Sequence, residues 1–143
     1  MRRLLCTSLL ALTAASAAAQ NDAAAAAKEP GALVTPSGLV YRALKEGDGA
    51  SPGATDRVRV HYRGTFLDGR EFDSSHARQQ PAEFALNRVI KCWTEGVQHM
   101  KVGGKAKLTC PPAIAYGERG AGGVIPPNTT LQFEIELLAV NGK

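Results

Sequence analysis

The sequence lacks the compositional features that mark several large classes of protein. Its 143 residues include only three cysteines, too few for a disulfide-dense toxin, and its net charge is only +4. The basic residues do not form the dense stripe that is typical of nucleic-acid-binding proteins, and no apolar run reaches the roughly 18–20 residues of a membrane-spanning helix. The composition also excludes collagen, a coiled coil and a wholly disordered chain. We therefore expect one folded domain that binds no nucleic acid and does not span a membrane.

The sequence also lacks the motifs of metal-dependent, nucleotide-dependent and covalent catalysis. His61, His76 and His99 do not stand at metal-ligand spacing from Cys, Asp or Glu. The glycine-rich segment Gly120–Gly123 is not followed by the Lys-Ser/Thr pair of a phosphate-binding loop, and no Gly-x-Ser-x-Gly motif occurs. We predict that the protein holds no metal and needs no cofactor.

The N-terminus is typical of a secretory signal peptide. Arg2–Arg3 is a basic start, Leu4–Leu12 is a short apolar run, and Ala17–Ala19 has the small-x-small form of a cleavage site. We predict a signal peptide over residues 1–19, cleaved after Ala19, and a mature protein in the periplasm or outside the cell. Cys6 is lost with this leader, which leaves an even pair of cysteines, and the net charge of +4 is halved.

Residues 20–33 form an alanine-rich segment that precedes the domain. Its alanine run, Ala23–Ala27, is short and has no second apolar face, and a helix of this length is marginal in water. We interpret residues 20–33 as a flexible tether, with a frayed helical turn as the alternative. The folded domain is then expected over residues 34–143.

Alternating patterns predict strands through this domain. Residues 57–63 place Val58, Val60 and Tyr62 on one face, and Asp68-Gly69 supplies the tight turn of a hairpin that returns over 70–74. Residues 131–137 alternate in the same way, and residues 105–110 form a third strand before two prolines. Residues 38–44 and 82–86 are weaker candidates.

One stretch alone indicates a helix, because Trp93, Val97 and Met100 recur at spacings of four and three before Gly103-Gly104 ends the pattern. An antiparallel sheet needs a cover on its buried face, and this helix is the available one. The sequence therefore predicts an α+β fold with an antiparallel sheet and one short helix.

Several short motifs stand in a fixed order over about residues 34–143. They are Val60-His61-Tyr62-Arg63-Gly64, Leu67-Asp68-Gly69, Phe72-Asp73-Ser74-Ser75, Val89-Ile90, Trp93-Thr94-Glu95-Gly96-Val97, Ala115-Tyr116-Gly117, Ile125-Pro126-Pro127-Asn128 and Leu131–Leu137. Each motif alone would be weak, whereas their joint order and spacing are specific. Together they resemble FKBP-type peptidyl-prolyl cis-trans isomerases, and in particular the small exported bacterial members. The family fold is a five- or six-stranded antiparallel sheet wrapped around one short helix, in agreement with the pattern above.

The resemblance implies a role for each matching residue. Trp93 would form the floor of a proline pocket, and Asp73 and Tyr116 would be the catalytic residues, although Asp73 before two serines is ordinarily a turn cap. Arg78 would pair with Asp73, with a solvated loop arginine as the alternative. The remaining substrate-binding residues would line the walls or hold the peptide: Tyr62, Phe72, Val89, Ile90, Ile125 and Phe133. Taken singly, aromatic residues on strands are more often core, and only the joint pattern favours the pocket.

The implied activity is cis–trans isomerisation of X-Pro bonds during the folding of exported proteins. The alternative is a non-catalytic, peptide-binding periplasmic chaperone that uses the same groove. Partners would be proline-containing polypeptides, with macrolide inhibitors as further ligands. We expect a monomer, because dimer-forming members carry a long helical arm before the domain and only about fifteen residues stand there in the mature chain.

The sequence departs from the family pattern at four positions. Ala82 stands where a bulky aromatic is common, and Ala121 lacks the histidine of some members, so a pocket wall and the macrolide contacts would differ. Cys92 and Cys110 stand where many members have glycine and a branched apolar residue. Because an exported protein meets oxidising conditions, we predict a Cys92–Cys110 disulfide, with two buried thiols as the alternative.

Overall fold

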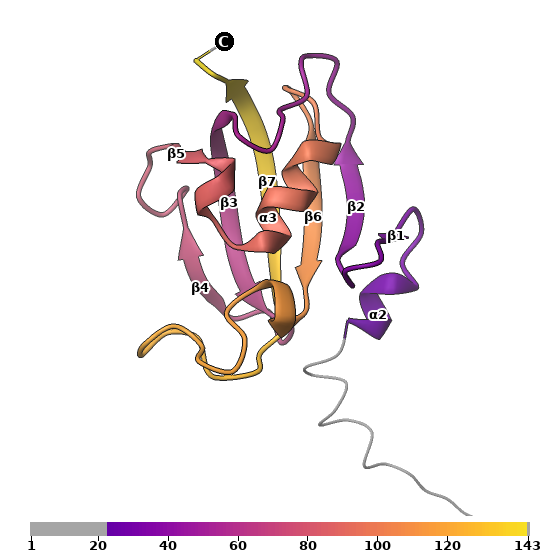
Figure 1. Cartoon of the computed structure of the whole chain (residues 1–143), viewed down its shortest axis with the longest axis vertical. Coiled ribbons are helices and arrows are strands. Elements are labelled where there is room, and N and C mark those ends of the chain that lie inside the picture. The colour runs from indigo at the N-terminus through magenta and orange to yellow at the C-terminus, as the bar shows by residue number, and fades with distance from the viewer. Residues whose placement is uncertain (1–22, 143) are drawn as a thin grey trace, which may run out of the picture.

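The computed structural model describes residues 23–142, and the predicted signal peptide lies outside them. Seven strands form one antiparallel sheet, in the order β1-β2-β6-β7-β3-β4 with β5 also paired to β3 (Figure 1). The strands are β1 Leu33–Val34, β2 Val40–Lys45, β3 Arg57–Phe66, β4 Glu71–Ser74, β5 Ala82–Ala85, β6 Lys105–Cys110 and β7 Leu131–Val140. The helices are α2 Ala24–Ala27 and α3 Lys91–Gly96, with 3-10 turns at Leu86–Arg88, Val97–His99 and Pro112–Ile114.

The long strand β3 organises one half of the sheet. Its polar–apolar alternation buries Val58, Val60 and Tyr62 on the face toward the helix, as the sequence predicts. It pairs with β7 along nearly its whole length, and with β4 and β5 on its other side. The β3–β4 hairpin turns at Asp68-Gly69, where Gly69 takes the positive φ of 92° that favours glycine.

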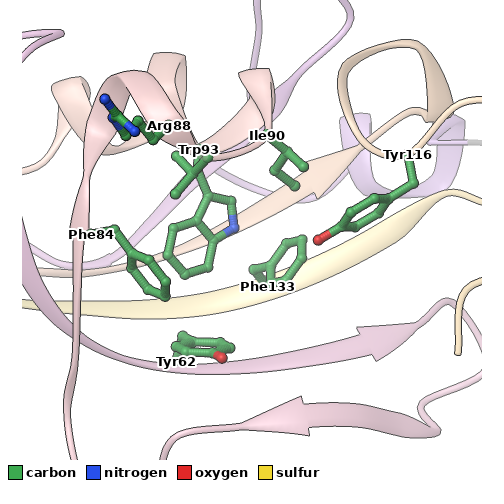
Figure 2. A pocket seen from close by; sticks show the side chains of 8 residues that line it. Tyr62, Phe84, Arg88, Ile90, Trp93, Tyr116 and Phe133 are labelled. Carbon is green, nitrogen blue, oxygen red and sulfur yellow. The ribbon is translucent and has the colours of Figure 1, made fainter. Parts of the chain in front are cut away.

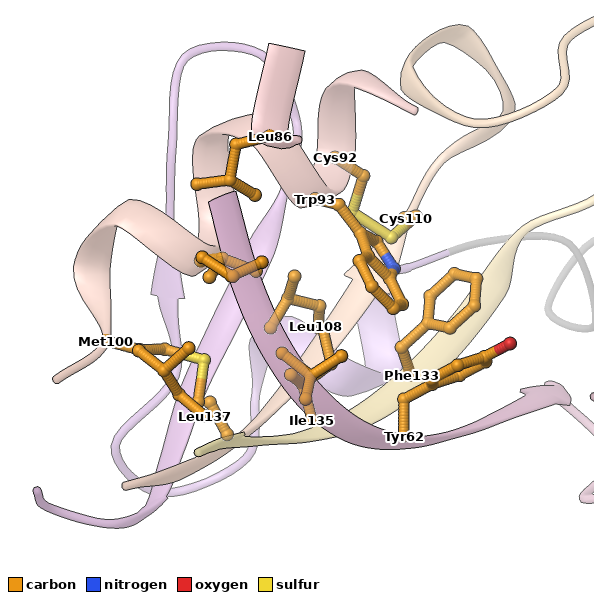
Figure 3. Close-up of a cluster of buried hydrophobic side chains, with 14 of the residues drawn as sticks. Tyr62, Leu86, Cys92, Trp93, Met100, Leu108, Cys110, Phe133, Ile135 and Leu137 are labelled. Carbon is orange, nitrogen blue, oxygen red and sulfur yellow. A yellow bond between two sulfur atoms is a disulfide. The ribbon is translucent and has the colours of Figure 1, made fainter. Parts of the chain in front are cut away.

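Helix α3 covers the buried face of the sheet, crossing it in Figure 1 over the central strands. Cys92, Trp93 and Gly96 face inward, and the 3-10 turn that follows adds the fully buried Val97. Gly96 has no side chain to separate helix from sheet, since a Cβ at this position would overlap Leu108 of β6. This close approach continues the core of Leu108, Ile135 and Leu137 up to the helix (Figure 3).

The structure has more strands than the five or six expected, because Leu33–Val34 adds a two-residue edge strand to β2. The alanine run forms the helical turn α2, which was the alternative to a flexible tether. Ala26 in this turn is buried. Glu29 then pairs with Lys107 of β6 at 3.2 Å and holds this segment against the sheet. No helix within residues 23–142 is long and apolar enough to cross a membrane.

Cys92 of α3 and Cys110 of β6 are joined by a disulfide in the structure, with their Cα atoms 5.8 Å apart (Figure 3). Both residues are fully buried. The bond ties the first turn of the helix to the end of a central strand, next to Trp93. It closes a loop with a sequence separation of 18 residues.

We predict that the double variant Cys92→Ala/Cys110→Ala loses about 3 kcal/mol of unfolding free energy, since a loop of this size restricts the unfolded chain. Urea denaturation monitored by circular dichroism measures the loss. A reductant should lower the midpoint of the unmodified protein, which retains both sulfur atoms, and leave the double variant unaffected. Equal midpoints for the reduced and oxidised protein would contradict the prediction.

Candidate active site

A cavity of about 460 Å³ opens between helix α3, strand β5 and the long strands β3 and β7 (Figure 2). The 3-10 turn before α3 and the loop after β6 complete its rim. Its wall is predominantly aromatic and aliphatic. The lining residues are Tyr62, Phe84, Arg88, Val89, Ile90, Trp93, Tyr116 and Phe133.

The indole of Trp93 forms the base of the cavity and is 4% exposed. The rings of Tyr62, Phe84 and Phe133 meet it edge-on, with centroids 5.2, 5.4 and 5.3 Å from that of Trp93. Edge-to-face contacts at this spacing are favourable because the positive edge of one ring meets the negative face of another. The buried Nε1 of Trp93 has no hydrogen-bond acceptor among the described residues, and Figure 2 shows this nitrogen on the side of Phe133.

A polar network stands behind the Tyr62 wall. The Tyr62 hydroxyl donates to Asp73 Oδ2 at 2.5 Å, and Arg78 Nη1 donates to the other carboxylate oxygen at 2.5 Å. Arg78 Nη2 also donates to the Tyr62 hydroxyl at 2.9 Å. The expected pairing of Arg78 with Asp73 is therefore present, and it extends to a closed triangle with Tyr62.

The network holds Asp73 as a carboxylate. Partial burial raises the pKa of Asp73, but hydrogen bonds from Tyr62 and Arg78 outweigh it, and the pKa lies below its usual value. Burial, followed by the hydrogen bond to Asp73, raises the pKa of Tyr62. The hydrogen bonds that Arg78 donates to Tyr62 and Asp73 raise the pKa of Arg78. The triangle therefore consists of a neutral phenol, an anion at Asp73 and a cation at Arg78.

Tyr116 enters the cavity from the loop that follows the 3-10 turn Pro112–Ile114. Figure 2 shows its ring reaching inward with the hydroxyl directed toward the pocket. Burial of the ring, followed by the negative charge of Asp73, raises the pKa of Tyr116. The hydroxyl is therefore protonated at neutral pH and is available as a donor.

The structure brings six of the expected residues to the cavity wall: Tyr62, Val89, Ile90, Trp93, Tyr116 and Phe133. Phe72 instead packs behind the wall, edge-on to Phe133 at 5.6 Å. Ile125 is buried in the core cluster, where its loop forms a bridge to Ala121. Asp73 stands outside the lining and reaches the cavity through Tyr62.

Sequence reasoning missed two lining residues, Phe84 and Arg88. Phe84 lies two positions after Ala82 on β5, hence on the same face of the strand, and its ring supplies the wall that Ala82 leaves thin. The alternation within 82–86 was a signal that could have located it. Arg88 belongs to the 3-10 turn Leu86–Arg88, which no sequence pattern predicts.

Within residues 23–142, no three His, Cys, Asp or Glu side chains gather in a way that could hold a metal ion. His61 and His76 do stack, with ring centroids 4.4 Å apart, and His61 Nδ1 lies 2.8 Å from the Ser75 hydroxyl. The cavity lining presents aromatic rings, two aliphatic side chains, two phenol hydroxyls and one guanidinium, and the Tyr62 hydroxyl is already engaged by Asp73. This lining suits an apolar ring flanked by peptide groups.

The fold and the pocket together define the class as FKBP-like. A crystal structure of FkpA from Escherichia coli matches with a TM-score of 0.79 and 48% identity, over 82% of this chain and 55% of that one. The structure of a peptidyl-prolyl cis-trans isomerase from Pseudomonas syringae pv. tomato matches with a TM-score of 0.80 and 39% identity, over 92% and 98% of the two chains.

The chain belongs to the FKBP-type peptidyl-prolyl cis-trans isomerase family, whose model matches residues 49–138. It is 55% identical over 114 residues to the FKBP-type 22 kDa peptidyl-prolyl cis-trans isomerase of Escherichia coli, covering 80% of this chain and 55% of the relative. FkpA of Aeromonas hydrophila is 56% identical over 117 residues, which are 82% of this chain and 43% of the relative. The chain thus spans about half the length of the curated relatives it matches.

We predict that Tyr62→Phe raises the pKa of Asp73 toward its ordinary value of 3.8, because the variant removes a donor to the carboxylate. In the unmodified protein the folded-state pKa is depressed, so the stabilisation by charged Asp73 is full above the unfolded-state pKa and is lost as pH falls through the folded-state value. An NMR titration of the Asp73 carboxyl carbon measures this pKa in the unmodified protein and in Tyr62→Phe.

Tyr116→Phe is the matched control for this titration. Tyr116 lies in the same cavity but makes no hydrogen bond to Asp73 among the described residues. It should therefore shift the Asp73 pKa less than Tyr62→Phe does. An Asp73 pKa that stays unchanged in Tyr62→Phe would contradict the geometry of the network.

Proposed function

We propose that this protein accelerates cis–trans isomerisation of X-Pro bonds in polypeptides during the folding of exported proteins. The observation that carries the proposal is the aromatic cavity, whose base is Trp93 and whose walls are the edge-on rings of Tyr62, Phe84 and Phe133. Its shape and lining suit a proline ring seated on the indole, and membership of the family supports the same reaction.

The reaction breaks no covalent bond, which suits a site without a nucleophile. The planar amide is held by resonance, and rotation must cross a barrier of about 18–20 kcal/mol. The twisted amide has lost this resonance and its charge separation. It therefore loses less hydration free energy than the planar amide on leaving water for an apolar cavity. Each 1.36 kcal/mol of preferential binding to the twisted state gives about a tenfold gain in rate.

In this proposal each polar group has a limited task. The Tyr116 hydroxyl donates to a substrate carbonyl, and the backbone at Val89 and Ile90 aligns the extended peptide. Asp73 orients a polar contact near the reacting amide, and it does so through Tyr62, whose ring forms a wall and whose hydroxyl it holds. Phe72 and Ile125 support the cavity from behind by packing.

Export is part of the proposal. The leader pattern over residues 1–19 supports cleavage after Ala19 and a mature protein in the periplasm or beyond. A buried disulfide between Cys92 and Cys110 fits an oxidising compartment. We further propose that the mature chain is a monomer, for which light scattering should give a single-chain mass. We also propose that macrolides compete with the substrate for the cavity.

A non-catalytic, peptide-binding chaperone would use the same cavity, and kinetics distinguishes the two functions. Cis-to-trans relaxation of a short X-Pro peptide is followed with and without the protein. Acceleration supports the isomerase. Peptide binding by the folded protein without acceleration would support the chaperone instead.

We predict that Tyr116→Phe lowers kcat/KM about three- to tenfold, because it removes one neutral hydrogen bond to the substrate and leaves the ring in place. Tyr41→Phe is the matched control, since the Tyr41 hydroxyl faces the carbonyl of His99 and the residue does not line the cavity. The peptide relaxation assay measures both variants. Equal rates for Tyr116→Phe and the unmodified protein would remove Tyr116 from the proposed mechanism.

A further inference from the structure

A second cavity adjoins the aromatic cavity on the other side of Val89. It has a volume of about 720 Å³ and runs along the outer flank of α3 toward the segment before β2. Val89, just before the helix, lines both cavities, so the two adjoin at this residue. The other residues that line the second cavity are Ser37, Asn87, Lys91, Thr94, Glu95, Gln98, His99 and Ile114.

Two cations stand on either side of this shared wall. Arg88 lines the aromatic cavity and Lys91 lines the second one, and both side chains are exposed. Neither makes an ion pair or a side-chain hydrogen bond with any residue in the part of the chain that the structure describes. Arg78, by contrast, is already engaged by Asp73 and Tyr62.

One acidic residue accompanies these two cations, so the two rims together carry a small excess of positive charge. Glu95 lines the second cavity four positions after Lys91 on α3, hence on the same face of the helix, and its carboxylate accepts a hydrogen bond from Ser37. His99 lines the same cavity and its ring contacts Tyr41. Figure 2 shows Arg88 at the opposite side of the aromatic cavity from Tyr116. A chain crossing Val89 therefore passes two cations that have no internal partner among the described residues.

We propose that the two cavities form one extended peptide site, and that Arg88 and Lys91 select substrates with an acidic side chain flanking the proline. The occupant is the polypeptide substrate itself, which continues from the proline pocket across Val89 along α3. The inference rests on the proposed function for its substrate class, and it adds a preference that the aromatic cavity alone cannot give. The adjacency of the two cavities at Val89 and the two cations without an ion pair among the described residues carry it.

The expected preference is modest, because both cations are solvated. An exposed ion pair of this kind gives about a two- to fivefold difference in affinity between an acidic peptide and its neutral isostere. Salt weakens it, since the screening length falls from about 30 Å at 0.01 M to about 3 Å at 1 M ionic strength. A preference due to apolar contact would not fall in this way.

The test uses two series of short X-Pro peptides, with Glu, Gln or Lys placed before the proline in one and after it in the other. Binding is read from the fluorescence of Trp93, the only tryptophan of the chain, which forms the cavity base. We expect tighter binding of Glu than of Gln peptides, and of Gln than of Lys peptides, in at least one series. The Glu-to-Gln ratio should approach one at high salt.

The double variant Arg88→Gln/Lys91→Gln should bring the Glu-to-Gln ratio close to one, and Arg88→Glu should favour the Lys peptide. Using the ratio within each variant cancels any change in overall affinity. The matched control is Arg59→Gln/Lys101→Gln, which removes two exposed cations that line neither cavity and should keep the preference.

The outcomes separate this inference from the proposed function. A charge preference in binding without any acceleration of isomerisation would support the inference and refute the isomerase. Acceleration of isomerisation with equal affinity for Glu, Gln and Lys peptides in both series would support the isomerase and overturn the inference. A preference that survives in Arg88→Gln/Lys91→Gln, or the absence of peptide binding altogether, would also overturn it.

Discussion

The contact between helix α3 and the sheet is the constraint on which the rest of the structure depends. A helix of six residues has no stability of its own in water, so its position must come from packing. Gly96 allows the helix to lie directly on Leu108, and the disulfide from Cys92 to Cys110 ties its first turn to β6. Trp93 lies between these two attachments. The base of the cavity is therefore held by two close attachments of the helix to the sheet.

The same contact separates apolar from polar groups. The aromatic rings occupy the space between helix and strands, where water is excluded, and the carboxylate of Asp73 is kept behind the wall by Tyr62 and Arg78. For the proposed reaction, a free carboxylate inside the cavity would favour the planar, charge-separated amide over the twisted one. Because Arg78 balances the charge of Asp73 outside the cavity, the carboxylate can orient Tyr62 without making the cavity polar.

Local patterns in the sequence predict the strands well, because alternation and turn residues act over a few positions. The alternation around Val58, Val60 and Tyr62 and the Asp68-Gly69 turn require no knowledge of distant contacts. The placement of the segment before β2 does depend on a distant contact, since Glu29 is held by Lys107, 78 residues away. Distant contacts also explain why Phe84 and Phe72 have different positions relative to the cavity. Both are aromatic residues on strands, and only the approach of α3 and Phe133 decides that one lines the cavity and the other supports it.

Under the proposed function, the division of labour between base and rim would let one cavity be both general and selective. Proline would be common to all substrates, and a ring seated on Trp93 would be recognised by shape and by loss of water, which carry no information about neighbouring residues. Neighbouring residues are met at the rim, where side chains are solvated and charges contribute little energy but act at a distance. In the inferred extended site, selectivity at the rim would change with single substitutions at Arg88 or Lys91, while the packing that positions Trp93 stays intact. In this fold the parts that must be rigid and the parts that can vary are thus carried by adjacent residues of one short segment.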